Sequence, residues 1–185
     1  GGSGVLRVED PLRPGAKEAI ETLKKMGIQT VLLSGDRPAE AERIGKQLGM
    51  EKVFGGVLPE GKISVIQDFS RQGRKVVMVG DGINDAPALS AASVGMAMAS
   101  GTDVAMEAAM VTLQRTEPGA VVDALSLSRQ TLQNIKQNLY LAFGYNALAI
   151  PLAALGKLHP AIAGTMMAFS SVMVVGNALR LRKQV

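Results

Sequence analysis

The run Lys75-Val76-Val77-Met78-Val79, followed at once by Gly80-Asp81-Gly82-Ile83-Asn84-Asp85, limits most strongly what this chain can fold into. A short apolar run rich in β-branched residues is typical of a buried parallel strand. The two glycines allow the backbone to turn tightly, and Pro87 suits the first turn of a helix because that turn needs no N–H from it. The pattern therefore predicts a strand, a loop and a helix, with the loop at the strand's carboxyl end, where open α/β sheets place their binding sites.

The side chains of this loop favour a hard cation. Asp81 and Asp85 offer carboxylates and Asn84 offers an amide, within five positions of one another. Oxygen ligands of this kind suit Mg²⁺, which usually shares them with a phosphate. A solvated turn without a ligand is the alternative.

Strands and helices alternate along the first two thirds of the chain. Glycine and proline positions delimit the segments, and strands that alternate with helices indicate a parallel sheet with right-handed crossovers. The expected strands are residues 5–8, 28–33, 53–57, 75–79, 94–98 and 110–113. One helix is expected to begin near residue 14 and another at residue 87. Further helices are expected at residues 38–48, 59–72 and 103–109.

Composition excludes several classes of protein. The chain contains no cysteine, which excludes a disulfide scaffold and a thiolate metal site within it. Its net charge is +4, and basic residues flank two apolar segments near the C-terminus, which favours a membrane-flanking role over nucleic-acid binding. Residues 1–4 have the composition of a linker or tag, and no secretory signal peptide opens the sequence.

A long amphipathic helix is expected over residues 120–138, and two almost wholly apolar segments follow at 139–155 and 161–179. Each apolar segment approaches the roughly 20 residues that span a bilayer. With Lys157 and His159 between them and more basic residues outside, the positive-inside rule predicts a hairpin with both ends cytoplasmic. The alternative is a pair of buried core helices. His159 is expected to be a surface loop residue.

The decapeptide from Gly80 to Leu89 resembles the hinge motif of the P-type ATPases. Val94–Met98 and Gly101–Ala105 are similar to the heavy-metal-transporting branch of that family. The resemblance extends from about Val5 to the end of the chain. It implies a partial haloacid dehalogenase-like parallel sheet over residues 5–117, the C-terminal half of a phosphorylation domain, and a connecting helix with a transmembrane α-helical hairpin over 118–185.

Two further segments carry groups that suit phosphoryl oxygens. Ser34 offers a hydroxyl, Gly35 an unhindered backbone N–H, and Lys62 a positive charge at a helix start, where the helix dipole also favours an anion. Ser34-Gly35-Asp36 resembles the family's Thr-Gly-Asp loop, with serine in place of threonine, and Lys62 resembles its phosphate-site lysine. The resemblance implies catalytic roles for these four residues and for Asp81, Asn84 and Asp85, with Mg²⁺ on Asp81 and Asp85. Taken singly, Ser34 or Lys62 would be read as an ordinary surface residue.

The family's nucleophile is the aspartate of Asp-Lys-Thr-Gly-Thr, which forms an acyl phosphate. None of the seven aspartates in this chain is followed by Lys-Thr-Gly. The family's nucleotide-binding domain, actuator domain and earlier membrane helices have no counterpart here either. We therefore expect the C-terminal part of a pump that is inactive alone, whose ATP is bound mainly by a domain outside this chain.

Polar residues interrupt both apolar segments. Tyr145 and Asn146 lie in the first, and Met167, Ser170 and Ser171 share a helix face in the second. The helix rise places Asn146 and Ser171 each about 12 Å from the cytoplasmic end. Polar groups at one depth indicate a substrate pathway, and thioether sulfur suits Cu(I). The alternative is that these residues only hold the helices together.

These residues resemble the signatures of the copper(I) subgroup, whereas the zinc and cadmium subgroup carries a lysine and an aspartate in these helices. The resemblance thus implies an ATP-driven copper(I) exporter in a bacterial or archaeal cell membrane, with the phosphorylation domain cytoplasmic. Its partners would be the rest of the pump, the lipid bilayer and a copper donor protein, and no nucleic acid. The competing hypotheses are a soluble haloacid dehalogenase-like phosphatase and a non-catalytic assembly module anchored by the hairpin.

Overall fold

The computed structural model describes residues 12–156 and 159–182, without the side chains of residues 145, 148, 160, 162, 163, 181 and 182. The chain divides into two compact units, residues 1–124 and 125–185, and each is described here by itself. The predicted linker at residues 1–4 and the predicted strand at residues 5–8 lie outside the described residues.

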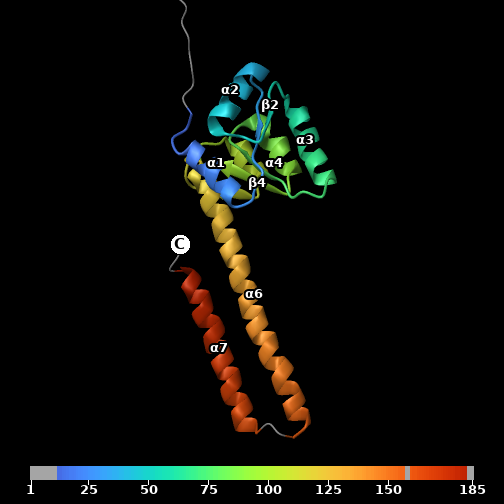
Figure 1. Ribbon diagram of the computed structural model, residues 1–185, viewed down its shortest axis with the longest axis vertical. Coiled ribbons are helices and arrows are strands. Elements are labelled where there is room, and N and C mark those ends of the chain that lie inside the picture. Colours follow the sequence, from blue (N-terminus) through green and yellow to red (C-terminus); the bar gives the residue numbers. More distant parts are fainter. Residues whose placement is uncertain (1–11, 157–158, 183–185) are drawn as a thin grey trace, which may run out of the picture. The chain divides into compact units, whose positions relative to one another are not determined.

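The first unit alternates helices and strands as the sequence predicts (Figure 1). Its elements are α1 (Ala16–Lys25), β1 (Val31–Leu33), α2 (Pro38–Leu48), β2 (Lys52–Phe54), α3 (Pro59–Arg71), β3 (Val77–Gly80), the 3-10 turn η1 (Ile83–Asp85), α4 (Ala86–Ala91), β4 (Val94–Met98), α5 (Asp103–Ala108) and β5 (Val111–Leu113).

Local sequence explains where these helices begin and end. Pro38 and Pro59 stand in the first turns of α2 and α3, where a missing N–H costs nothing. Gly49 ends α2 in the left-handed region at φ 69°, and its N–H bonds back to the carbonyls of the last turn. Proline at the start and glycine at the end therefore fix α2 on both sides.

All strand pairs in the described residues are parallel, but the strands form two sheets and not one. One sheet has the order β1-β2 and the other the order β3-β4-β5. In the second sheet Val77 pairs with Val94, and Met96 pairs with Val111. The predicted parallel pairing is present, but no ladder joins β1 to β3 in the part of the chain that the structure describes, so the strands fall into two groups.

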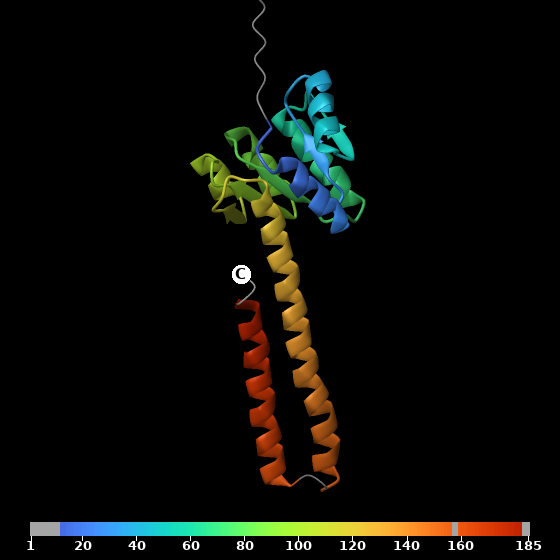
Figure 2. The ribbon, with the colours of Figure 1, turned by 60° about the vertical axis from the view of Figure 1, so that its left-hand side comes forward.

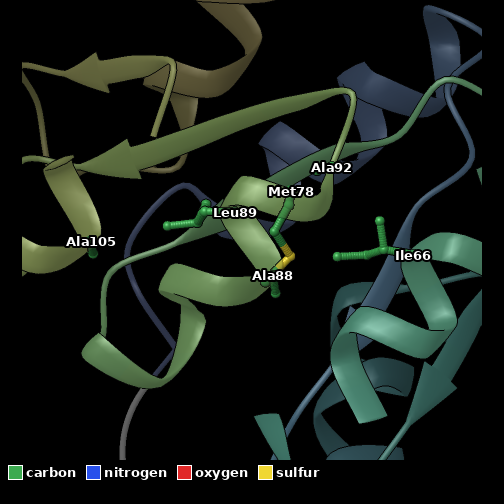
Figure 3. Packing of buried hydrophobic residues seen from close by; sticks show 6 residues of the cluster. All are labelled: Ile66, Met78, Ala88, Leu89, Ala92 and Ala105. Atoms are coloured by element: carbon green, nitrogen blue, oxygen red, sulfur yellow. The ribbon is translucent and has the colours of Figure 1, made fainter. Parts of the chain in front are cut away.

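The core of the first unit lies between α3, α4 and the three-stranded sheet (Figure 3). Ile66 and Leu89 are 1% exposed, and Met78 from β3 lies between them. Gly95 of β4 is required by this packing, since a Cβ there would lie 2.5 Å from the carbonyl oxygen of Leu89. This core anchors β3 and α4, the two elements that flank the loop at Asp81–Asp85.

The second unit consists of two helices that lie side by side in opposite directions (Figures 1 and 2). Helix α6 (Gly119–Ala154) starts in the first unit and continues into the second as one helix, and α7 (Pro160–Arg182) returns along it. Asparagine amides join them. Asn134 Nδ2 donates to the carbonyl of Asn177 at 2.8 Å, and Asn177 Nδ2 donates to Asn138 Oδ1 at 2.8 Å.

Among the helices in the described residues, none combines the length and the apolarity that crossing a membrane requires. The two predicted helices are present, but their assignment as a transmembrane hairpin is not confirmed. His159 is exposed and lies just before α7, as predicted, and its Nδ1 accepts the N–H of Ala161 at 3.3 Å.

Candidate functional site

The loop after β3 is built around an ion pair between Asp85 and Lys62. Lys62 Nζ lies 2.6 Å from Asp85 Oδ1, and the two side chains are only 13% and 15% exposed. Lys62 belongs to the first turn of α3, so a helix that packs on the core delivers the ammonium to the loop. Among the predicted site residues that the structure describes, this pair joins two that lie on different elements, α3 and the loop after β3.

The close approach of backbone and carboxylate explains Gly80. A Cβ at Gly80 would lie 2.8 Å from Asp85 Cβ and 3.0 Å from Asp85 Oδ2, too close for any side chain. The turn itself is held by the N–H of Asp85, which donates to the carbonyl of Gly82 at 3.0 Å. Pro87 follows in the first turn of α4, one residue after the helix begins.

Asp81 contacts a partner that sequence analysis missed. Arg13 Nη2 lies 2.7 Å from Asp81 Oδ2, and Arg13 Nη1 also donates to Ser100 Oγ and to the carbonyl of Thr116. Arg13 and Asp81 are 68 positions apart, so no local pattern links them. The only signal in the sequence is an isolated basic residue between two prolines.

The segment after β1 forms a compact turn of its own. Ser34 Oγ donates to Asp36 Oδ2 at 2.7 Å and accepts the backbone N–H of Asp36 at 3.1 Å. The N–H of Val57 donates to the carbonyl of Ser34, which ties the turn to the segment after β2. No hydrogen bond or ion pair among the described residues joins Ser34, Gly35 or Asp36 to the loop at Asp81–Asp85, so their convergence stays a prediction.

The donor set around the loop suits Mg²⁺ only if further ligands come from elsewhere. Within the described residues no group of three or more His, Asp or Glu side chains could hold a metal ion. Mg²⁺ is commonly bound by one or two carboxylates together with waters and phosphate oxygens. Asp81 and Asp85 can supply two carboxylates, each already facing one cationic side chain, and Asn84 is exposed beside them.

The residues predicted for copper lie in the second unit. Met167 on α7 is 66% exposed, Ser170 is half-buried, and Ser171 Oγ donates to the carbonyl of Met167 within the same helix. Asn146 on α6 is exposed, and the side chain of Tyr145 lies outside the described residues. In the described part of the unit, the hydrogen bonds between the helices come instead from Asn134, Gln137, Asn138 and Asn177.

Comparison with known families supports the fold class. The family model for haloacid dehalogenase-like hydrolases matches residues 3–93. Parallel strands linked by helices, with a loop of carboxylates after β3, are therefore the architecture of a haloacid dehalogenase-like domain.

Within the haloacid dehalogenase-like class, curated relatives and a solved structure point to similarity with metal-transporting ATPases. The chain is 49% identical over 181 residues to a copper-exporting P-type ATPase of Bacillus subtilis, covering 98% of this chain and 23% of the relative. It is 51% identical over 187 residues to a copper-exporting P-type ATPase of Vibrio cholerae, covering 97% of this chain and 20% of the relative. The structure also aligns with a zinc-transporting PIB-type ATPase at a TM-score of 0.86 and 40% identity, covering 94% of this chain and 28% of that one.

Over nearly its whole length, the chain is therefore similar to part of the metal-transporting P-type ATPases. It spans less than a quarter of the length of the curated relatives described above.

Proposed function

We propose that this chain supplies the phosphoryl-site half of an ATP-driven copper(I) export pump. The observation that carries the proposal is the shielded Lys62–Asp85 pair at the carboxyl end of β3, in a chain about half identical to copper exporters. A soluble haloacid dehalogenase-like phosphatase receives less support, because the relatives are P-type ATPases over nearly the whole chain.

In this proposal residues 5–117 form the C-terminal half of the phosphorylation domain. Asp81 and Asp85 hold Mg²⁺, which neutralises phosphate charge when bound, and Asn84 supports the loop. Lys62 carries the charge that faces the phosphoryl group, while Ser34, Gly35 and Asp36 bind its oxygens. Positioning and charge neutralisation are the main tasks in phosphoryl transfer. The nucleophile and most of the ATP-binding surface come from other parts of the pump.

The transported ion is proposed to be copper(I), bound in part by Tyr145, Asn146, Met167, Ser170 and Ser171. The structural relative transports zinc, whereas the curated relatives export copper. The chemistry of the two apolar segments supports copper(I) as the transported ion. Residues 139–155 and 161–179 contain no Asp, Glu, Lys or Arg, and residues 161–179 contain Met166, Met167 and Met173, whose soft sulfur suits Cu(I).

Residues 118–185 are proposed to join the membrane part of the pump. Apolar side chains on both helices are largely exposed, among them Phe143 at 64%, Ile150 at 67% and Val172 at 68%. Extended exposed apolar surface marks an interaction site. The remaining membrane helices and lipid are the proposed partners that cover it, and a copper donor protein would deliver the ion.

A chimera tests the proposal. This chain would replace the matching segment of the Bacillus subtilis exporter, and copper(I)-stimulated ATP hydrolysis would be measured in proteoliposomes. We expect copper to stimulate the chimera and zinc not to, and the chain alone to form no hydroxylamine-sensitive phosphoenzyme. Stimulation by zinc but not copper would refute the choice of ion, and labelling of the chain alone would refute its role as a partial site.

A further inference from the structure

Arg13 ties three connecting segments of the first unit together. Its Nη2 lies 2.7 Å from Asp81 Oδ2 in the loop after β3. Its Nη1 donates to Ser100 Oγ at 3.3 Å, after β4, and to the carbonyl of Thr116 at 3.1 Å, after β5. Nothing in the proposed function assigns a task to this guanidinium, although it contacts a proposed Mg²⁺ ligand.

The contact is accessible to ions in solution. The Arg13 and Asp81 side chains are 45% and 47% exposed, in contrast to the shielded pair of Lys62 and Asp85. A guanidinium and a divalent cation at about 4 Å repel by about 2 kcal/mol in water-like surroundings and by more where the dielectric constant is lower. Arg13 and Mg²⁺ therefore compete for the carboxylate of Asp81.

The backbone of Asp81 is held without help from Arg13. Its carbonyl accepts the N–H of Thr102 at 3.0 Å, and Gly101 packs so closely that a Cβ there would lie 3.2 Å from that carbonyl oxygen. Removing the guanidinium thus changes the charge facing the carboxylate more than its position. This distinguishes a competitor from a positioning residue, whose loss would weaken metal binding.

We propose that Arg13 is a built-in counter-cation of Asp81. Arg13 pairs with the Asp81 carboxylate when the loop is metal-free, and Mg²⁺ must displace Arg13 in order to bind that carboxylate. Arg13 thereby raises the Mg²⁺ concentration at which the loop fills. The inference rests on the proposed Mg²⁺ role of Asp81 and adds to it the group that opposes binding.

The test is a titration of the full ¹⁵N-labelled chain with Mg²⁺ alone, following the amide resonances of Gly82 and Asp85 by NMR. We expect Arg13→Gln to lower the Kd for Mg²⁺ by about three- to tenfold, because the repulsive charge is gone. Arg13→Lys should stay near the wild-type value. The control is Arg71→Gln, which removes the same charge from the exposed Arg71–Asp68 pair and should leave the Kd unchanged. Added NaCl should shrink the effect of Arg13→Gln by screening.

An unchanged or raised Kd in Arg13→Gln would overturn the inference. If that variant loses its native spectrum, the wild-type chain still decides, because the Arg13 Nε–H resonance must shift on Mg²⁺ saturation and a static resonance would refute displacement. Asp81→Asn separates the two proposals. If it binds Mg²⁺ as tightly as the wild type, the Mg²⁺ assignment fails and takes the inference with it. If it loses binding while Arg13→Gln behaves as wild type, only the role of Arg13 fails.

Discussion

Gly80 shows how tightly single residues constrain the proposed site. The nearest atoms to a Cβ at this position are those of Asp85, the first at 2.8 Å, whereas at Gly82 the nearest two atoms lie at 3.8 and 3.9 Å. Neither glycine has a positive φ, so the difference is purely steric. Gly80 therefore has to lack a side chain, and Gly82 does not.

This contrast gives a paired prediction. Gly80→Ala should lower the free energy of unfolding by about 1–3 kcal/mol, the usual cost of overpacking, and should displace the carboxylate of Asp85 from Lys62. Gly82→Ala should change the free energy of unfolding by less than about 0.5 kcal/mol. Chemical denaturation of both variants measures the effect. Equal stabilities of the two variants would show that the loop relaxes freely around Asp85.

Sequence reasoning reached some of these residues and missed others. Lys62 and Asp85 belong to motifs that the family resemblance already placed in one site, and the structure puts them 2.6 Å apart. Arg13 belongs to no motif, and its contact with Asp81 depends on how strands β3, β4 and β5 bring their following loops together. Such a contact becomes visible only when the sheet order is known.

At the scale of whole elements, the pairing of α6 with α7 depends on a few partly buried side-chain amides. Asn177 Nδ2 donates to Asn138 Oδ1 at 2.8 Å and to Gln137 Oε1 at 3.4 Å. Its side chain also lines a shallow groove of about 510 Å³, with Tyr140, Leu141, Met173 and Arg180. Hydrogen bonds between apolar helices average about 0.6 kcal/mol each, so losing two should loosen the pair without separating it.

We therefore expect Asn177→Leu to broaden the distance distribution between spin labels on α6 and α7. The chain has no cysteine, so labels can be attached through single cysteines introduced at Leu139 and Val175, both more than half exposed. Pulsed electron–electron double resonance measures the distribution of distances between the two labels. Asn146→Leu is the matched control, because Asn146 is exposed and makes none of these interhelical bonds. Identical distributions for Asn177→Leu and the wild type would show that apolar packing alone sets the pairing.

The boundaries of an element were predictable where residues in the sequence that favour its start or its end mark them. Helix α2 runs from Pro38 to Leu48 as predicted, since a proline opens it and Gly49 closes it. Strand β4 also matches its predicted bounds, Val94–Met98. The amide contacts between Asn134, Asn138 and Asn177 were not predicted, because polar residues in an apolar helix do not reveal which helix they face.

Across the whole molecule, the sequence predicted parallel pairing but not which strands pair. Alternating strands and helices require parallel neighbours, and every observed ladder is parallel. The division into β1-β2 and β3-β4-β5 depends on neighbours that periodicity does not specify. Val77 and Val79 of β3 are each 37% exposed, more than a strand buried on both faces would allow.

The two proposed sites belong to different units of the chain, Asp85 to the first and Met167 to the second. Their chemistry should therefore be separable in a complete pump that contains this chain. The P-type ATPase resemblance implies that phosphorylation by ATP waits for the bound ion, whereas phosphorylation by inorganic phosphate proceeds without it. Asp85→Ala removes a proposed Mg²⁺ ligand and should abolish both reactions.

Met167→Ala should instead lose copper-dependent phosphorylation by ATP and keep phosphorylation by inorganic phosphate. The change removes a soft sulfur ligand and leaves the loop at Asp81–Asp85 intact. Because the Met167 side chain is 66% exposed in this structure, truncating it should cost little stability, and the retained reverse reaction serves as the control for folding. Radioactive phosphate incorporation measures both reactions. Full copper-dependent turnover in Met167→Ala would show that this methionine only packs against its neighbours in the pump and that the copper assignment is wrong.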